Sequence, residues 1–102
     1  MEAQEFLNAL AECRDRIDEV DLRILELLNA RTRIVEEIAE IKQQARLPIY
    51  EPKREDEVFE NVMGHNGGPL GPESVKRIFE RIIDEMRVVQ RIRMEGKQKG
   101  NG

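Results

Sequence analysis

Several residue types that mark particular protein classes are scarce in this sequence. It has no tryptophan, 4% aromatic residues, one cysteine and one histidine among 102 residues. A single cysteine, Cys13, excludes an internal disulfide, and one cysteine with one histidine gives neither a metal-ligand spacing nor a nucleophile with its base. No apolar run approaches the roughly 20 residues that span a bilayer, and none resembles a signal-peptide core. We therefore expect a soluble, cytoplasmic protein with no membrane segment.

Positive charge is also in deficit. Seventeen Lys and Arg against 21 Asp and Glu give a formal net charge of −4, the wrong sign for a protein that binds nucleic acid mainly through phosphates. The 37% of charged residues is typical of one small domain of charge-rich helices rather than a β-sandwich or barrel. A lone domain of this size buries about 60–70% of its unfolded-chain surface, so contact with a second chain is one way to add stability.

Apolar residues recur with helical spacing from Leu10 to Ile41. They follow alternating steps of three and four, and no Gly or Pro occurs before Pro48. A helix from about residue 5 to 45 is about 60 Å long, whereas a compact 100-residue domain has a radius of gyration of about 13 Å. Such a helix cannot bury its apolar row within its own chain, so we expect a homodimer whose long helices pack together. The row consists of Leu10, Cys13, Ile17, Val20, Ile24, Leu27, Arg31, Ile34, Ile38 and Ile41.

Proline and glycine divide the remainder of the chain. Pro48 and Pro52 break the long helix, and Pro52 suits the first turn of a second helix that ends at Gly64. The turn residues clustered over 65–72 predict a surface loop.

A third helix is expected after this loop, because apolar residues recur with helical spacing over 75–92. Residues 95–102 contain no apolar side chain, so we expect a flexible polar tail there. The predicted fold is all-α, with three helices per chain in one domain over residues 1–94 that pairs as a helical homodimer.

Long polar side chains on apolar faces are the most informative residues, because lysine and arginine are seldom fully buried. Each one alone is explained by snorkelling to water or by fixing the helix register. Their occurrence on all three predicted helices favours a binding site instead. They are Arg31 in the long row, Arg14 and Lys42 beside it, Arg54 and Glu55 on the second helix, and Gln90 on the third.

Helix geometry constrains how these side chains share a ligand. Arg31 and Lys42 are separated by about 16 Å of helix rise, so inward-leaning side chains can hold two ends of a ligand about 6–8 Å long. Arg14 is about 25 Å from Arg31, too far to share that ligand within one chain, but an antiparallel dimer brings it close. Cations that face one pocket repel each other unless an anion neutralises them. The expected ligand is therefore a small molecule with at least two negative groups.

Several short segments occur in an order and spacing that resemble one enzyme family. They are Arg14, RIDEVD (16–21), LLNAR (27–31), IAEIK (38–42), PIYEPKRE (48–55), and FERIIDEM (79–86) with Gln90. The family is that of the all-helical chorismate mutases, and the resemblance covers about residues 5 to 94. It implies an intertwined dimer of three-helix chains with two equivalent active sites. It also implies an intramolecular Claisen rearrangement of chorismate, a dicarboxylate, to prephenate on the path to phenylalanine and tyrosine, with no cofactor or metal.

The resemblance assigns roles to the cationic residues and to the amide. It implies that Arg31 and Arg14 of the partner subunit bind the two carboxylates. Lys42 reaches the enolpyruvyl carboxylate and the ether oxygen, and Gln90 donates to the same ether oxygen.

The remaining site residues by this resemblance surround the substrate ring. Glu55 accepts a hydrogen bond from the ring hydroxyl, Glu51 lies near that hydroxyl, and Arg54 lines the pocket. Met86 occupies a position where a small hydroxyl residue often binds the ring carboxylate, and an ordinary core methionine is an equal interpretation. Two alternative functions stay open: an isochorismate-pyruvate lyase of the same fold, and a non-catalytic helical dimerisation or regulatory module.

Overall fold

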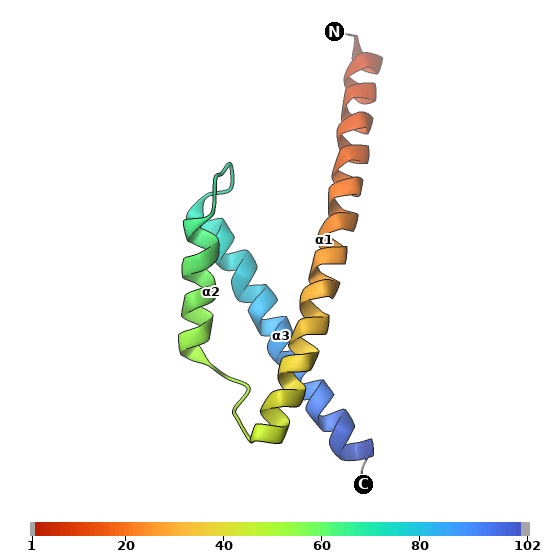
Figure 1. The fold of residues 1–102 in the computed structure, drawn as a ribbon. Helices are drawn as coiled ribbons and strands as arrows, with labels where there is room; N and C mark the ends of the chain where they lie inside the picture. The colour runs from red at the N-terminus through yellow and green to blue at the C-terminus, as the bar shows by residue number, and fades with distance from the viewer. Residues whose placement is uncertain (1, 101–102) are drawn as a thin grey trace. The chain divides into compact units, whose positions relative to one another are not determined.

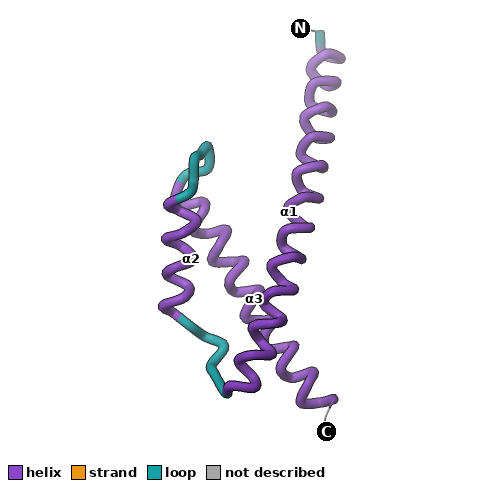
Figure 2. The backbone as a smooth tube through the Cα atoms, in the orientation of Figure 1, coloured by secondary structure: helices purple, strands orange, loops and turns teal. Residues whose placement is uncertain are grey.

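The computed structural model describes residues 2–100 and the side chains of residues 2–96. It contains three helices, α1 (Ala3–Ala45), α2 (Pro52–Gly64) and α3 (Pro72–Gly100) (Figure 1). The described residues include no strand, so the all-α prediction with three helices is confirmed. Figure 2 shows short non-helical connections between consecutive helices. Over residues 2–100, none of the helices has both the length and the apolar character needed to cross a bilayer.

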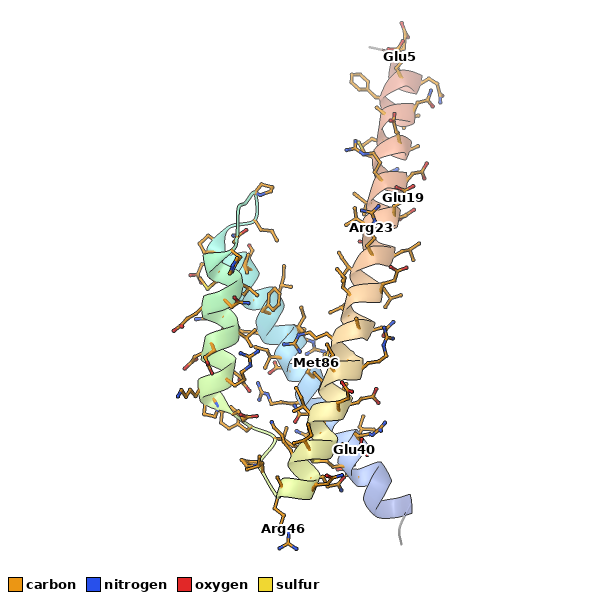
Figure 3. The ribbon with its side chains drawn as sticks, viewed as in Figure 1. Glu5, Glu19, Arg23, Glu40, Arg46 and Met86 are labelled. Atoms are coloured by element: carbon orange, nitrogen blue, oxygen red, sulfur yellow. The ribbon has the colours of Figure 1, made fainter. Side chains whose placement is uncertain are left out.

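The chain divides into two compact units, Met1–Arg33 and Ile34–Gly102. The first unit is the N-terminal part of α1, from which side chains such as Glu5, Glu19 and Arg23 project (Figure 3). Every described residue from 2 to 27 is exposed, including the apolar row, and Leu27 has 70% of its surface exposed. In this unit the apolar row is therefore not covered by the chain itself.

The second unit contains the apolar core. The end of α1 contacts α3, because Arg93 pairs with Glu36 at 3.3 Å and the Gln43 amide donates to the Met94 carbonyl at 3.3 Å. Helix α2 packs on α3, and the two lie side by side in Figure 1. The buried apolar residues are Val35 and Ala39 from α1 and Val75, Ile83 and Met86 from α3.

A left-handed turn ends α1. Arg46 has φ of 56°, a conformation that favours glycine. The Leu47 amide donates to the Lys42 carbonyl at 2.8 Å, and the Arg46 amide donates to the Gln43 carbonyl at 3.4 Å. This pair of bonds is a Schellman cap, which satisfies carbonyls at the helix end. The cap redirects the chain into the connection over residues 46–51.

The last two helices begin at proline, as predicted for α2. The connection between them is exposed, as expected for a surface loop, and is organised by Asn66, whose side chain accepts from the Gly68 amide and donates to the Leu70 carbonyl. Helix α3 is assigned as far as Gly100 and residues 101–102 lie outside the described residues, so the flexible polar tail expected over 95–102 stays a prediction. Lysine and glutamine are good helix formers, so they can extend a helix that packing has already nucleated.

Candidate active site

Two polar side chains are buried in the core of the second unit. Lys42 has 6% of its surface exposed and Gln90 has 8%, and the other buried residues of the described chain are apolar. Lys42 continues the buried face of α1 that contains Val35 and Ala39, and Gln90 lies one helical turn beyond Met86 on α3. Burial of an ammonium or an amide is unfavourable unless the group is hydrogen-bonded or paired. The surroundings of these two groups therefore determine what the site can bind.

The connection between α1 and α2 holds the Lys42 ammonium. Its Nζ donates to the Ile49 carbonyl at 2.9 Å and forms an ion pair with Glu51 Oε1 at 2.6 Å. The turn at Arg46 brings the chain back toward Lys42, only seven residues before Ile49 along the sequence. An ammonium has three donors, so these two partners fix its position and still permit a bond to a ligand.

The Gln90 amide is incompletely satisfied. Its Oε1 is buried and has no hydrogen-bond partner among the described residues. A buried polar atom left in this state costs about 1–3 kcal/mol, and folded proteins pair nearly all such atoms. Because the amide has a donor end and an acceptor end, it can bind oxygen or N–H groups of a ligand. A buried amide oxygen without a hydrogen-bond partner is typical of a binding site rather than of an apolar core.

Glu55 belongs to a charged cluster between α2 and α3. Arg87 Nε lies 3.2 Å from Glu55 Oε2, and Arg87 Nη2 donates to Glu55 Oε1 at 3.4 Å. The same guanidinium pairs with Asp84 at 2.7 Å and lies over the Tyr50 ring, 5.5 Å from its centroid. Glu55 is 20% exposed and Arg87 33%. The Glu55 carboxylate is thus ion-paired and held at a partly buried position.

The other predicted site residues have less definite positions. Arg54 is exposed on α2, whereas Met86 is buried with the apolar core on α3 (Figure 3). Glu51, expected near the ring hydroxyl, forms an ion pair with the Lys42 ammonium. Arg14 and Arg31 belong to the first unit, where Arg14 is exposed and Arg31 half-buried. The structure therefore brings together Lys42 and Glu51, and the gathering of all the cations around one ligand stays a prediction.

Arg87 and Tyr50 are site-adjacent residues that the sequence argument missed. A signal for Arg87 was present, because it lies four residues after Ile83 and three before Gln90, on the buried row of α3. The rule that selected Arg31, a long polar side chain on an apolar face, also selects Arg87. No comparable signal existed for the Ile49 carbonyl, since a backbone acceptor leaves no mark in the sequence.

Comparison with known proteins identifies relatives along most of the chain. Over 76% of its length it is 41% identical to a bifunctional chorismate mutase/prephenate dehydratase from Aquifex aeolicus, of which it spans 22%. It is 31% identical to a chorismate mutase from Methanocaldococcus jannaschii, and the match covers 94% of this chain and 98% of that protein. The chain therefore spans about a fifth of the bifunctional relative and nearly all of the archaeal one.

Solved structures and a family model agree with these relatives. The fold matches chorismate mutase (form II) from Thermus thermophilus with a TM-score of 0.79 and 31% identity, over 81% of this chain and 94% of that one. A family model described as chorismate mutase type II matches residues 13–91. This match extends over most of the chain and includes α2 and most of α1 and α3. The chain belongs to the chorismate mutase type II family.

Proposed function

We propose that this chain is a chorismate mutase, an isomerase that converts chorismate to prephenate in the biosynthesis of phenylalanine and tyrosine. One observation carries the proposal: the core of a member of this family contains a buried ammonium, Lys42, and a buried, incompletely bonded amide, Gln90. Burial of such groups without hydrogen-bond partners lowers the stability of the fold, so their presence indicates a binding role. They have the donors that a rearrangement with a developing negative charge requires. The cytoplasmic location expected from the sequence stays a prediction.

The proposed chemistry uses Lys42 and Gln90 at the ether oxygen of chorismate. In the rearrangement one C–O bond breaks and one C–C bond forms within the same molecule, with no gain or loss of protons or electrons. Negative charge grows on the ether oxygen as the C–O bond lengthens. The Lys42 ammonium and the Gln90 amide therefore interact more strongly with the transition state than with the substrate, and the barrier falls.

The cationic side chains hold the substrate in its reactive conformation. We assign the two carboxylates to Arg31 and to Arg14 of the partner subunit, with Arg54 lining the pocket. Holding both ends of a flexible dianion brings the reacting carbons together and lowers the entropic part of the barrier. This assignment requires an intertwined homodimer. The exposed apolar row of the first unit supports it, because an exposed row of this length normally marks an interface.

The acidic residues have separate roles in this proposal. Glu55 accepts a hydrogen bond from the ring hydroxyl, and its partly buried carboxylate is suited to that role. Glu51 holds the Lys42 ammonium through the 2.6 Å ion pair. Met86 contributes an apolar wall next to the ring, so the ring carboxylate depends on the arginines.

A chorismate-disappearance assay with product identification tests the function. We expect the purified chain to consume chorismate and to form prephenate. Release of pyruvate from isochorismate, with chorismate left intact, would assign the chain to the lyase alternative. If calorimetry detects binding of chorismate but the assay detects no turnover, the chain is a non-catalytic module.

A further inference from the structure

The Glu55 carboxylate poses an electrostatic problem for the proposed substrate. Chorismate has two carboxylates, and a third negative charge beside it raises the energy of the bound state by Coulomb repulsion. This repulsion acts on the substrate and on the transition state alike, because both have the same total charge. A site with Glu55 at the ring hydroxyl therefore needs a nearby cation that is not used by the substrate.

Arg87 is placed to be that cation. Its Nη2 donates to Glu55 Oε1 at 3.4 Å, and its Nε lies 3.2 Å from Glu55 Oε2 as an ion pair without hydrogen-bond geometry. Asp84 holds the same guanidinium from α3 at 2.7 Å, and the Tyr50 ring lies against it. A planar guanidinium held on three sides is a fixed partner for a carboxylate rather than a mobile surface charge.

This arrangement leaves Glu55 able to bind a ligand. A carboxylate accepts about four hydrogen bonds through its two oxygens, and Arg87 approaches each oxygen once. Acceptor capacity remains on both oxygens. The ring hydroxyl can therefore donate to Glu55 while the ion pair stays intact.

We propose that Arg87 is a positioning residue that acts through Glu55: it orients the carboxylate and offsets part of its charge, which lowers the repulsion of a dianionic substrate beside it. This inference rests on the proposed function. Arg87 has no contact with the substrate in this scheme. Its removal weakens the binding of substrate and transition state about equally, which raises KM and leaves kcat largely unchanged.

A double-mutant cycle on KM tests the proposal. We expect Arg87→Met to raise KM about tenfold, the order of one charge-assisted hydrogen bond, with kcat changed less than about threefold. Glu55→Gln removes the carboxylate charge and keeps an acceptor. In the Glu55→Gln background, Arg87→Met is expected to change KM less than about twofold, because the charge it compensates is gone. The double variant should therefore have a lower KM than Arg87→Met alone.

Two further measurements separate charge from packing. Arg87→Lys keeps the positive charge without the planar fork and should restore part of the KM, whereas a packing role would not be rescued by lysine. Added salt should reduce the KM difference between wild type and Arg87→Met, since the pair is partly exposed and is screened. Arg81→Met is the matched control, because Arg81 is on the same helix, pairs with Glu85 at 2.8 Å and is 77% exposed.

The possible results distinguish this proposal from the proposed function. A wild-type chain without chorismate turnover overturns the function and this inference with it. A wild-type enzyme with normal turnover, in which Arg87→Met raises KM equally in both backgrounds or leaves it unchanged, overturns the role of Arg87 alone. If Arg87→Met unfolds at the assay temperature, Arg87→Gln takes its place in the cycle: a KM rise that disappears in the Glu55→Gln background supports the charge role, and an equal rise in both backgrounds contradicts it.

Discussion

The two parts of α1 have the same apolar spacing but different surroundings. Over residues 2–27 every side chain is exposed, whereas between residues 34 and 45 Val35, Ala39 and Lys42 are buried. The residue types do not explain this contrast, since the exposed part is as rich in leucine and isoleucine as the buried part. Burial depends on whether another element covers a face of the helix: in the second unit the face with Val35, Ala39 and Lys42 is covered. The last three members of the apolar row stay 39–62% exposed there, namely Ile34, Ile38 and Ile41.

This contrast supports the proposal that the first unit packs against another copy of the chain. The second unit has its own apolar core and the buried Lys42 and Gln90. The first unit exposes a row of large apolar residues, and an isolated helix in water has little stability without packing of its apolar face. If a second copy of the chain packs on this row, as proposed, the contact stabilises the helix and brings Arg14 to the partner's site.

The largest expected effect is from a charge in the exposed row. In an isolated chain Leu27→Glu changes little, because Leu27 is already 70% exposed. In a dimer that covers the row, it buries an unpaired carboxylate, which costs several kcal/mol and lowers the association constant by about 1,000-fold or more. Light scattering and thermal unfolding at several protein concentrations measure this loss. Leu70→Glu, in the exposed loop, is the control, and equal behaviour of the two variants would contradict cover of the row.

The next largest effect concerns the buried polar groups of the second unit. Lys42→Ala and Gln90→Ala should each lower kcat at least about 100-fold, the size typical of removing one transition-state donor. The thermal midpoint should also fall, because alanine leaves a cavity and, at position 42, leaves the Ile49 carbonyl and Glu51 without their partner, so kcat is compared at a temperature where each variant is folded. Steady-state kinetics with chorismate measures the loss. Near-normal kcat in either variant would refute its assigned role.

Local sequence signals predicted the helices well. The expected helix over about 5–45 is α1 at Ala3–Ala45, and the expected bounds of the second helix, Pro52 and Gly64, are those of α2. Proline and glycine set helix ends through their own backbone chemistry, so their effect can be read from sequence. The end of α3 had no such signal, because the helix is assigned to Gly100 without any apolar residue beyond Met94 to indicate it.

Contacts between distant segments were less predictable. The bond from Lys42 to the Ile49 carbonyl depends on a left-handed turn at Arg46, and a non-glycine residue gives no signal for such a turn. The pairing of Arg87 with Glu55 depends on how α2 packs on α3. Helical periodicity selected Lys42 and Gln90 as polar residues on apolar faces. It could not predict which groups these side chains contact, because that depends on how distant segments pack.

A smaller effect is expected when the Lys42 ammonium loses one partner. Glu51→Gln removes the ion pair at 2.6 Å, but Glu51 is half exposed and the Ile49 carbonyl still accepts from Lys42. We expect kcat to fall about three- to tenfold, because the ammonium is held less firmly at the reacting oxygen. Glu57→Gln removes an exposed carboxylate from the adjoining helix α2 and serves as the control. A Glu51→Gln variant that is as fast as wild type, or faster, would mean that the ion pair does not assist Lys42.

The smallest expected effect is on the free energy of unfolding, from a substitution at the Arg46 turn that leads into the connection between α1 and α2. Arg46 has φ of 56°, and its side chain extends away from the helices (Figure 3). Arg46→Gly relieves the left-handed strain, which costs about 1–2 kcal/mol in other residues, but adds freedom to the unfolded chain. We expect a net gain of about 0.5–1 kcal/mol in the free energy of unfolding, with kcat unchanged because the Schellman cap is kept. Gln44→Gly, inside the last turn of α1, should instead lose about 0.5–1 kcal/mol. Denaturant unfolding of the two variants compares them directly, and destabilisation by both would contradict a strained turn at Arg46.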